Sequence, residues 1–345
     1  MNFSILTKIF VLASLAFITA LGFTPIFLEF LSKKKLGKQI RNDGSTPLYS
    51  SLHASKAGTP SMGGVLIWGS LAGLMLLFWL LDRVLHLPAF AHMDFYSRRE
   101  TLLPLGALVG AAMVGLIDDW LDMRQKGYKG RGLRFRFKLV LYTIVAIIGA
   151  WWFYFKLGFS TVHVPFLGNA DLGVWFLPFF VLAVVSTSFA VNETDGLDGL
   201  AGGVLLVAFF SFGLISFLQG KYELASFIAV ICGALLAFLW FNVHPARFIM
   251  GDTGAMGLGV LLAVVAFLTN SVFLLIFIGF IFALEALSVL LQMFWKRYFK
   301  KKLFLSAPIH HHFQALGWPE SQITMRFWIV SAVMAIIGVI IYFIG

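Results

Sequence analysis

Apolar runs long enough to cross a bilayer recur along almost the whole chain, with short polar stretches between them. A membrane-spanning helix needs about 20 mostly apolar residues. The pattern therefore predicts ten transmembrane helices. They lie near residues 5–31, 62–81, 102–117, 138–157, 173–191, 199–218, 224–241, 254–269, 271–293 and 326–344. The eighth and ninth are the hardest to separate, because only Asn270 and Ser271 interrupt the apolar sequence there.

Two further features of the pattern refine this picture. Residues 161–175 begin with alternating polar and apolar positions and carry Gly-Asn in the middle, which is consistent with a small external β-hairpin. The first apolar run has no convincing small-residue cleavage site, so we expect a true helix rather than a signal peptide. No convincing internal repeat is present, which disfavours a transporter built from inverted halves.

The composition agrees with a membrane protein. Of the 345 residues, 60% are hydrophobic and 12% are charged, against about 25% charged residues in ordinary soluble domains. This balance excludes a disordered chain and argues strongly against a soluble enzyme. The single cysteine, Cys232, lies in an apolar run and is expected to be a buried packing residue rather than a disulfide or metal ligand.

The basic residues predict the orientation. The net charge is +10, and alternate loops, beginning with the one after the first helix, hold 20 of the 26 Lys and Arg residues. The positive-inside rule places those loops in the cytoplasm and both termini outside. The predicted fold class is thus an all-α polytopic membrane protein of about ten helices, a single domain over residues 1–345 embedded in the lipid bilayer, with no nucleic-acid partner.

Carboxylates gather at the same cytoplasmic helix ends, which the positive-inside rule does not explain. The polar groups are Asp118, Asp119 and Asp122; Asn192, Asp195 and Asp198; and Asp252. Any one of them could be a helix cap or a solvated loop residue. Facing carboxylates repel unless a cation lies between them, and Mg²⁺ binds carboxylates together with substrate phosphates. The pattern D-D-x-x-D at a helix end therefore suggests a site for Mg²⁺ and a diphosphate.

Two other cytoplasmic motifs add nitrogen ligands and positive charge. Residues 310–312 are consecutive histidines, which cannot all face one way on a helix. Lys56 precedes a Gly-Thr-Pro turn and could hold a phosphate, and Lys138 could add positive charge. Each also has a plain alternative, a loop histidine without a function or a lysine that only sets orientation.

Taken together, these motifs resemble one family. The motifs are K-A-G-T-P-S-M-G-G, I-D-D-W, N-E-T-D-G-L-D-G-L-A-G-G, F-N-V-H-P-A-R-F-I-M-G-D-T-G and A-P-I-H-H-H-F, followed by G-W-P-E and R-F-W. They closely resemble segments of the phospho-N-acetylmuramoyl-pentapeptide transferases. The resemblance implies a homodimeric, Mg²⁺-dependent enzyme of the bacterial cytoplasmic (inner) membrane with its active site on the cytoplasmic face. It would transfer phospho-MurNAc-pentapeptide from UDP-MurNAc-pentapeptide to undecaprenyl phosphate and give lipid I, for peptidoglycan synthesis, and UMP.

The resemblance also implies roles for individual residues. The implied catalytic residues are Asp118, Asp119, Asp252 and His311, with Asp252 and Asp118 as metal ligands and either member of the aspartate pair as the base. The implied substrate-binding residues are Lys56, Ser61, Asn192, Asp195, Asp198, Asn242, His310 and His312. Asp122, Glu193 and Ile249 depart from the usual family pattern.

Three alternatives stay open at this point. The related polyprenyl-phosphate N-acetylhexosamine-1-phosphate transferases share the Asp-Asp motif, and Asp122 favours them mildly, but the P-I-H-H-H-F segment disfavours them. A transporter or Mg²⁺ channel would have polar residues near helix centres, whereas these lie at helix ends. A phosphatase with a histidine nucleophile would require an arginine-rich phosphate motif near the histidines, and none is found.

Overall fold

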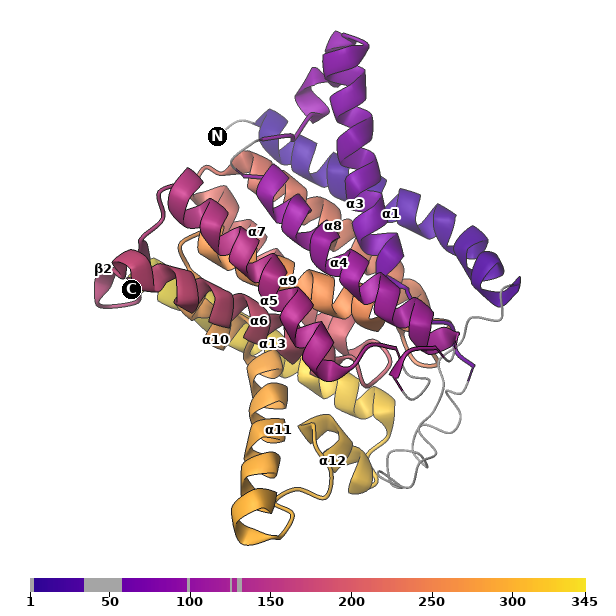
Figure 1. The fold of residues 1–345 in the computed structure, drawn as a ribbon. Helices are drawn as coiled ribbons and strands as arrows, with labels where there is room; N and C mark the ends of the chain where they lie inside the picture. Colours follow the sequence, from indigo (N-terminus) through magenta and orange to yellow (C-terminus); the bar gives the residue numbers. More distant parts are fainter. Residues whose placement is uncertain (1–2, 34–57, 98–99, 125, 129–131) are drawn as a thin grey trace.

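A computed structural model describes residues 3–33, 58–97, 100–124, 126–128 and 132–345, and helices dominate it (Figure 1). The long helices are α1 (Phe3–Lys33), α3 (Gly64–Trp79), α4 (Leu102–Met123), α5 (Phe135–Trp151), α6 (Phe176–Thr194), α7 (Leu200–Leu218), α8 (Tyr222–Asn242), α9 (Gly251–Leu268), α11 (Phe280–Phe299) and α13 (Glu320–Ile344). The short elements are η2 (Leu80–Val84), η3 (Pro88–Met93), η5 (Trp152–Lys156), η6 (Gly173–Trp175), η7 (Val272–Leu274), α10 (Leu275–Ile278) and α12 (Ile309–Ala315). Lys56 lies outside the described residues.

Nine helices of the described residues are long and apolar enough to cross a membrane, and a bent pair brings the number to ten. The predicted all-α polytopic fold is therefore confirmed, and the chain is a multi-pass membrane protein. The predicted span near 271–293 corresponds to this bent pair. Val272–Ile278 and Phe280–Phe299 meet at 84°, with Gly279 at the break. Apolar composition identified this segment, but it carries no information about the direction of the chain.

Helix α9 is the innermost helix of the bundle. Every one of its residues is buried except Asp252, and it packs most extensively against α4 and α6. Small residues allow these close contacts: a Cβ on Gly115 of α4 would lie 2.4 Å from the backbone carbon of Asp252. Because α9 is enclosed, the polar group at its first turn has a fixed position relative to the neighbouring helices.

The expected hairpin is present. Strands β1 (Thr161–Val164) and β2 (Gly168–Asp171) pair antiparallel, with Val164 opposite Gly168. The backbone N–H of Phe166, in the turn, donates to the carbonyl of Gly345 at 3.2 Å, so the hairpin lies beside the C-terminus (Figure 1).

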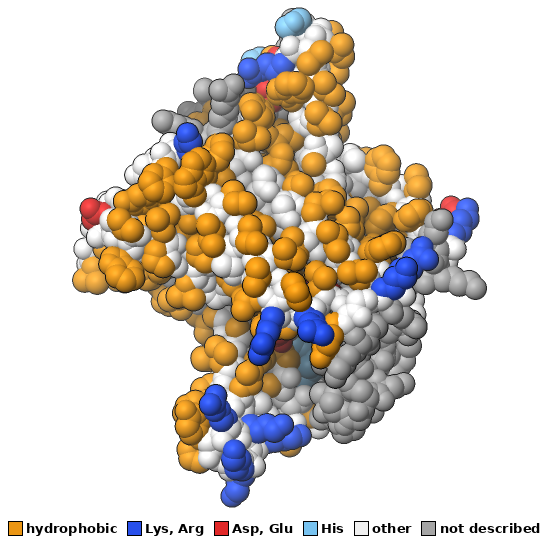
Figure 2. All heavy atoms as spheres, viewed as in Figure 1, with side chains coloured by type: hydrophobic (Ala, Val, Ile, Leu, Met, Phe, Trp, Pro, Cys, Tyr) orange, Lys and Arg blue, Asp and Glu red, His pale blue; other side chains and the backbone are white. Residues whose placement is uncertain are grey.

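The surface agrees with a bilayer-embedded bundle. Figure 2 shows apolar side chains over most of the visible face, and many Lys and Arg side chains in its lower part, around α11 and near the lower ends of α4 and α5. The basic last turn of α11 contains Lys296 and Arg297. On the face shown, most of the described Lys and Arg side chains thus lie toward one end of the bundle (Figure 2).

Candidate active site

The C-terminal turn of α4 and the first turn of α9 meet at the same end of the bundle. The hydroxyl of Thr253 donates to the carbonyl of Ala112 at 2.8 Å and thereby ties the two helices together. The junction brings Asp118 and Asp119 next to Asp252, 133 positions away from Asp119 in the sequence. Oxygen atoms of all three carboxylates lie within 4.8 Å of one another.

Asp119 caps helix α9 from outside that helix. Its two carboxylate oxygens accept the backbone N–H groups of Asp252 and Thr253, each at 3.0 Å. The first N–H groups of a helix have no partner within the helix, and a carboxylate there also interacts favourably with the helix dipole. Gly251 permits the approach, because it has φ +73° and a Cβ there would lie 2.5 Å from Asp119 Oδ2.

Asp118 and Asp252 face a lysine instead. Lys138, in the first turn of α5, places its Nζ 2.5 Å from Asp118 Oδ2 and 2.7 Å from Asp252 Oδ2. The other oxygen of Asp118 accepts the backbone N–H of Leu133 at 2.6 Å. The ammonium group lies between two carboxylates that would otherwise repel, so this cluster already contains the positive charge that the sequence argument required. Lys138 had been expected to add positive charge but was not among the predicted site residues.

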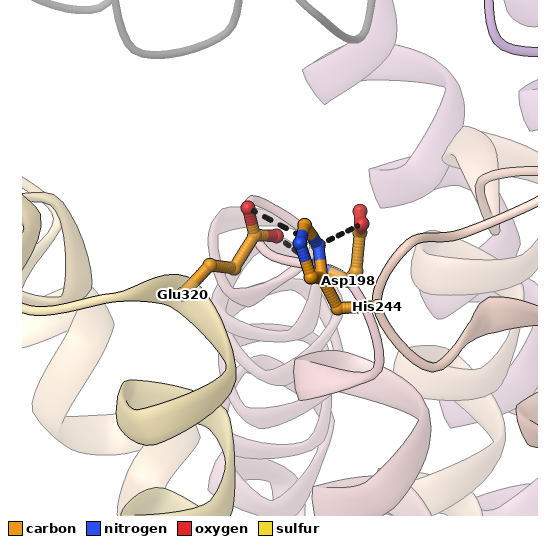
Figure 3. A group of neighbouring side chains, drawn as sticks. All are labelled: Asp198, His244 and Glu320. Atoms are coloured by element: carbon orange, nitrogen blue, oxygen red, sulfur yellow. Dashed lines mark hydrogen bonds and ion pairs between the residues drawn. The ribbon is translucent and has the colours of Figure 1, made fainter.

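A second polar cluster contains Asp198, His244 and Glu320, which come from three different segments (Figure 3). The Nδ1 atom of His244 lies 2.9 Å from Asp198 Oδ2 and 3.9 Å from Glu320 Oε2. The two carboxylates are nearly buried, whereas the histidine side chain is 45% exposed. Asp198 is one of the predicted site residues, whereas His244 and Glu320 are not; their only signal in the sequence is that they stand in the quoted motifs.

Asp195 and Asn242, two of the predicted substrate residues, make hydrogen bonds to backbone groups near these clusters. The carboxylate of Asp195 accepts the backbone N–H of Gly251 at 3.1 Å. The buried amide of Asn242 accepts from Gly199 N–H at 3.0 Å and donates to the carbonyl of Phe248 at 2.8 Å. The described contacts of Asn242 are thus with the protein backbone, and its contact with the nucleotide stays a prediction.

The remaining substrate residues lie nearby. Ser61 is buried, and its hydroxyl would lie 2.6 Å from a Cβ on Gly251, so it borders the aspartate cluster. Asn192 is partly exposed near the end of α6, and its carbonyl accepts the backbone N–H of Asp195 at 3.1 Å.

The three histidines have different polar contacts, although the rings of His310 and His311 lie against each other with centroids 4.0 Å apart. His310 is fully buried, with Nδ1 3.0 Å from Oε2 of the fully buried Glu285. His311 Nδ1 lies 2.8 Å from Gln314 Oε1, and His312 Nδ1 accepts the backbone N–H of Leu305 at 3.2 Å. His310 also meets the loop of the second cluster, since a Cβ on Gly196 would lie 2.2 Å from its Nε2.

Comparisons with known proteins identify the family of this chain. Residues 101–270, which contain both members of the aspartate pair and Asp252, match the model of glycosyl transferase family 4. Residues 56–67 match signature 1 of the phospho-N-acetylmuramoyl-pentapeptide transferases. A phospho-N-acetylmuramoyl-pentapeptide transferase of Chloroflexus aggregans is 39% identical, over 97% of this chain and 89% of the relative. Another, of Anoxybacillus flavithermus, is 36% identical over 95% of this chain and 96% of the relative.

The chain belongs to the phospho-N-acetylmuramoyl-pentapeptide transferase family. The resemblance predicted from the motifs is confirmed, and so is the prediction of phospho-MurNAc-pentapeptide transfer. The N-acetylhexosamine-1-phosphate transferase alternative is not favoured. Membership in a transferase family also disfavours the transporter and phosphatase alternatives.

Proposed function

We propose that the cluster at the junction of α4 and α9 is the catalytic centre for this transfer. The reaction passes phospho-MurNAc-pentapeptide from its UDP-linked donor to undecaprenyl phosphate and gives lipid I and UMP. The supporting observation is that three carboxylates and one lysine converge at the end of helices whose remaining length is apolar. A reaction between a water-soluble nucleotide and a membrane lipid requires this location at the bilayer surface.

The residues present fit a Mg²⁺ ion. They offer carboxylate oxygens, the hard ligands that Mg²⁺ prefers, and Lys138 already marks the space between Asp118 and Asp252 as a cation position. Asp118 and Asp252 would hold the ion, whereas both oxygens of Asp119 are engaged by backbone N–H groups. When bound, Mg²⁺ supplies charge neutralisation at the donor diphosphate and at the UMP leaving group.

The roles of the protein residues follow from their contacts. Lys138 adds positive charge where two anionic substrates must approach each other. Either member of the aspartate pair remains a candidate for the base, because Asp119 is engaged by the cap of α9 and Asp118 by Lys138 and the backbone N–H of Leu133. The lipid phosphate ionises with a second pKa of about 6, by analogy with phosphorylated side chains, so positioning and charge neutralisation carry most of the catalysis.

An apolar groove between two helices offers a path for the acceptor chain. A groove of about 610 Å³ lies between α5 and α6, and its lining includes Thr143, Trp151, Pro178 and Val185. Thr143 is five residues beyond Lys138 on the same helix, or about 7.5 Å along the helix axis. We propose that this groove binds the polyprenyl chain, because it is lined almost entirely by apolar side chains.

We also propose the remaining properties that the family resemblance implies. They are a place in the bacterial cytoplasmic membrane with the catalytic centre and the histidine motif on the cytoplasmic face, and a homodimeric assembly. Within this proposal His310 and His312 contribute to donor binding, and His311 lines the catalytic centre. The uneven distribution of Lys and Arg supports the orientation. Labelling of single cysteines in intact cells would test the orientation, and light scattering in detergent would test the dimer.

The deciding experiment supplies the purified protein with undecaprenyl phosphate and Mg²⁺ and measures UMP release from two donors. Release from UDP-MurNAc-pentapeptide, its loss on chelation of Mg²⁺ and no release from UDP-GlcNAc are expected. Release from UDP-GlcNAc alone would move the chain to the related N-acetylhexosamine-1-phosphate branch. No release from either donor by folded protein would contradict the proposal.

A further inference from the structure

One face of α13 holds the backbone of the loop between α6 and α7. The carboxylate of Glu320 accepts the backbone N–H of Asp198 at 2.5 Å, and the hydroxyl of Thr324 donates to the Asp198 carbonyl at 3.1 Å. The indole N–H of Trp328 donates to the carbonyl of Gly199 at 3.1 Å. These three side chains are spaced i, i+4 and i+8, so they form one stripe along the helix. We call them the α13 clamp.

The neighbouring glycines show how closely the clamp fits. A Cβ on Gly203 would lie 2.1 Å from the ring of Trp328, and one on Gly199 would lie 3.5 Å from it. Gly199 also has φ +76°, a conformation that favours glycine. The loop therefore presents its bare backbone to α13, and the three polar groups of the clamp bind two consecutive residues of it.

The clamped residues hold the exposed histidine. Oδ2 of Asp198 accepts the backbone N–H of Ala246 at 3.0 Å and lies 2.9 Å from His244 Nδ1. Nδ1 thus faces the buried carboxylate (Figure 3), and the imidazole side chain is 45% exposed, so Nε2 is the ring nitrogen that a ligand could reach. Glu320 lies close to the same imidazole and supports it from the side of α13.

The nearly buried position of Glu320 needs a reason beyond packing. Its side chain is only 12% exposed, and burial of a carboxylate is costly unless hydrogen bonds and opposite charge compensate. Simple contact between α13 and α7 would be served by apolar side chains, which line most of both helices. A carboxylate that binds one backbone N–H and flanks one imidazole instead fixes a geometry.

We propose that Glu320, Thr324 and Trp328 are positioning residues for the donor substrate. They fix the backbone at Asp198 and Gly199, so that the Asp198–His244 pair presents the outer imidazole nitrogen to the nucleotide-sugar donor. This inference rests on the proposed function, and it gives a role to the G-W-P-E and R-F-W motifs, for which the transfer reaction alone provides none.

The test measures KM for each substrate, with the other saturating, in Glu320→Gln, Thr324→Val and Trp328→Phe. Loss of one backbone hydrogen bond is expected to raise the donor KM about fivefold in Thr324→Val, with kcat and the acceptor KM nearly unchanged. Ser331→Ala is the matched control. It also removes one buried hydroxyl from α13, and that hydroxyl has no hydrogen-bond partner among the described residues.

A double-mutant cycle separates positioning from general stability. If the clamp acts through the pair, His244→Ala combined with Glu320→Gln will raise the donor KM by less than the product of the single effects. Independent effects, an unchanged donor KM, or equal rises for both substrates would overturn the inference. If Glu320→Gln does not fold, Trp328→Phe retains the aromatic ring and tests the same point. Wild-type protein that releases no UMP would instead refute the proposed function itself.

Discussion

Substitution of Gly251 by alanine tests the close approach of α4 to α9. A Cβ at this position would lie 2.5 Å from Asp119 Oδ2 and 2.6 Å from Ser61 Oγ. The residue also has φ +73°, which costs an alanine about 1–2 kcal/mol. Overpacking in a buried site adds about 1–3 kcal/mol. We therefore expect Gly251→Ala to lower the free energy of unfolding by about 2–5 kcal/mol and to reduce turnover sharply.

Gly220→Ala separates the two contributions. Gly220 also has φ +73°, but a Cβ there would meet nothing within 4 Å. This control should lose only about 1–2 kcal/mol and keep full activity. Thermal unfolding in detergent and UMP release would be measured for both variants. The proposed geometry of the Asp119 cap would be refuted if Gly251→Ala melted at the same temperature as Gly220→Ala and kept wild-type turnover.

Three further predictions concern the site and the groove. Asp252→Asn should remain folded but lose nearly all UMP release. It should also bind Mn²⁺ more weakly, as measured by electron paramagnetic resonance; retained binding and activity would exclude Asp252 as a ligand. Asp119→Asn replaces one acceptor of the cap by a donor and should lower the stability by about 1–3 kcal/mol, measured by thermal unfolding, whereas an unchanged melting temperature would contradict the capping role. Val181→Trp should fill the α5–α6 groove and raise the acceptor KM with the donor KM unchanged, whereas Leu214→Trp, an exposed position on α7, should change neither.

The sequence predicted the spans well and drew attention to the carboxylates at helix ends, because both leave a local signal. Long apolar runs identify helices, and carboxylates at their ends are conspicuous. The break at Gly279 had no such signal, since α10 and α11 are similarly apolar on both sides of it.

The partners within the site were harder to predict. Glu320 and Asp198 are 122 positions apart, and periodicity shows which face a residue occupies but not what that face meets. The pair of adjacent aspartates illustrates the same difficulty. Sequence alone made them equivalent, whereas in the structure Asp119 binds the backbone of α9 and Asp118 binds Lys138.

The enclosure of α9 has a consequence for how the enzyme tolerates its surroundings. Because the other helices cover every residue of α9 but one, lipids contact the outer helices, and the helix that carries Asp252 has no direct contact with them. A change of bilayer thickness or headgroup acts first on outer helices such as α1 and α13, most of whose residues are not buried. The chemistry can thus persist across membranes of different composition, while adaptation to each membrane is carried by substitutions on the lipid-facing helices.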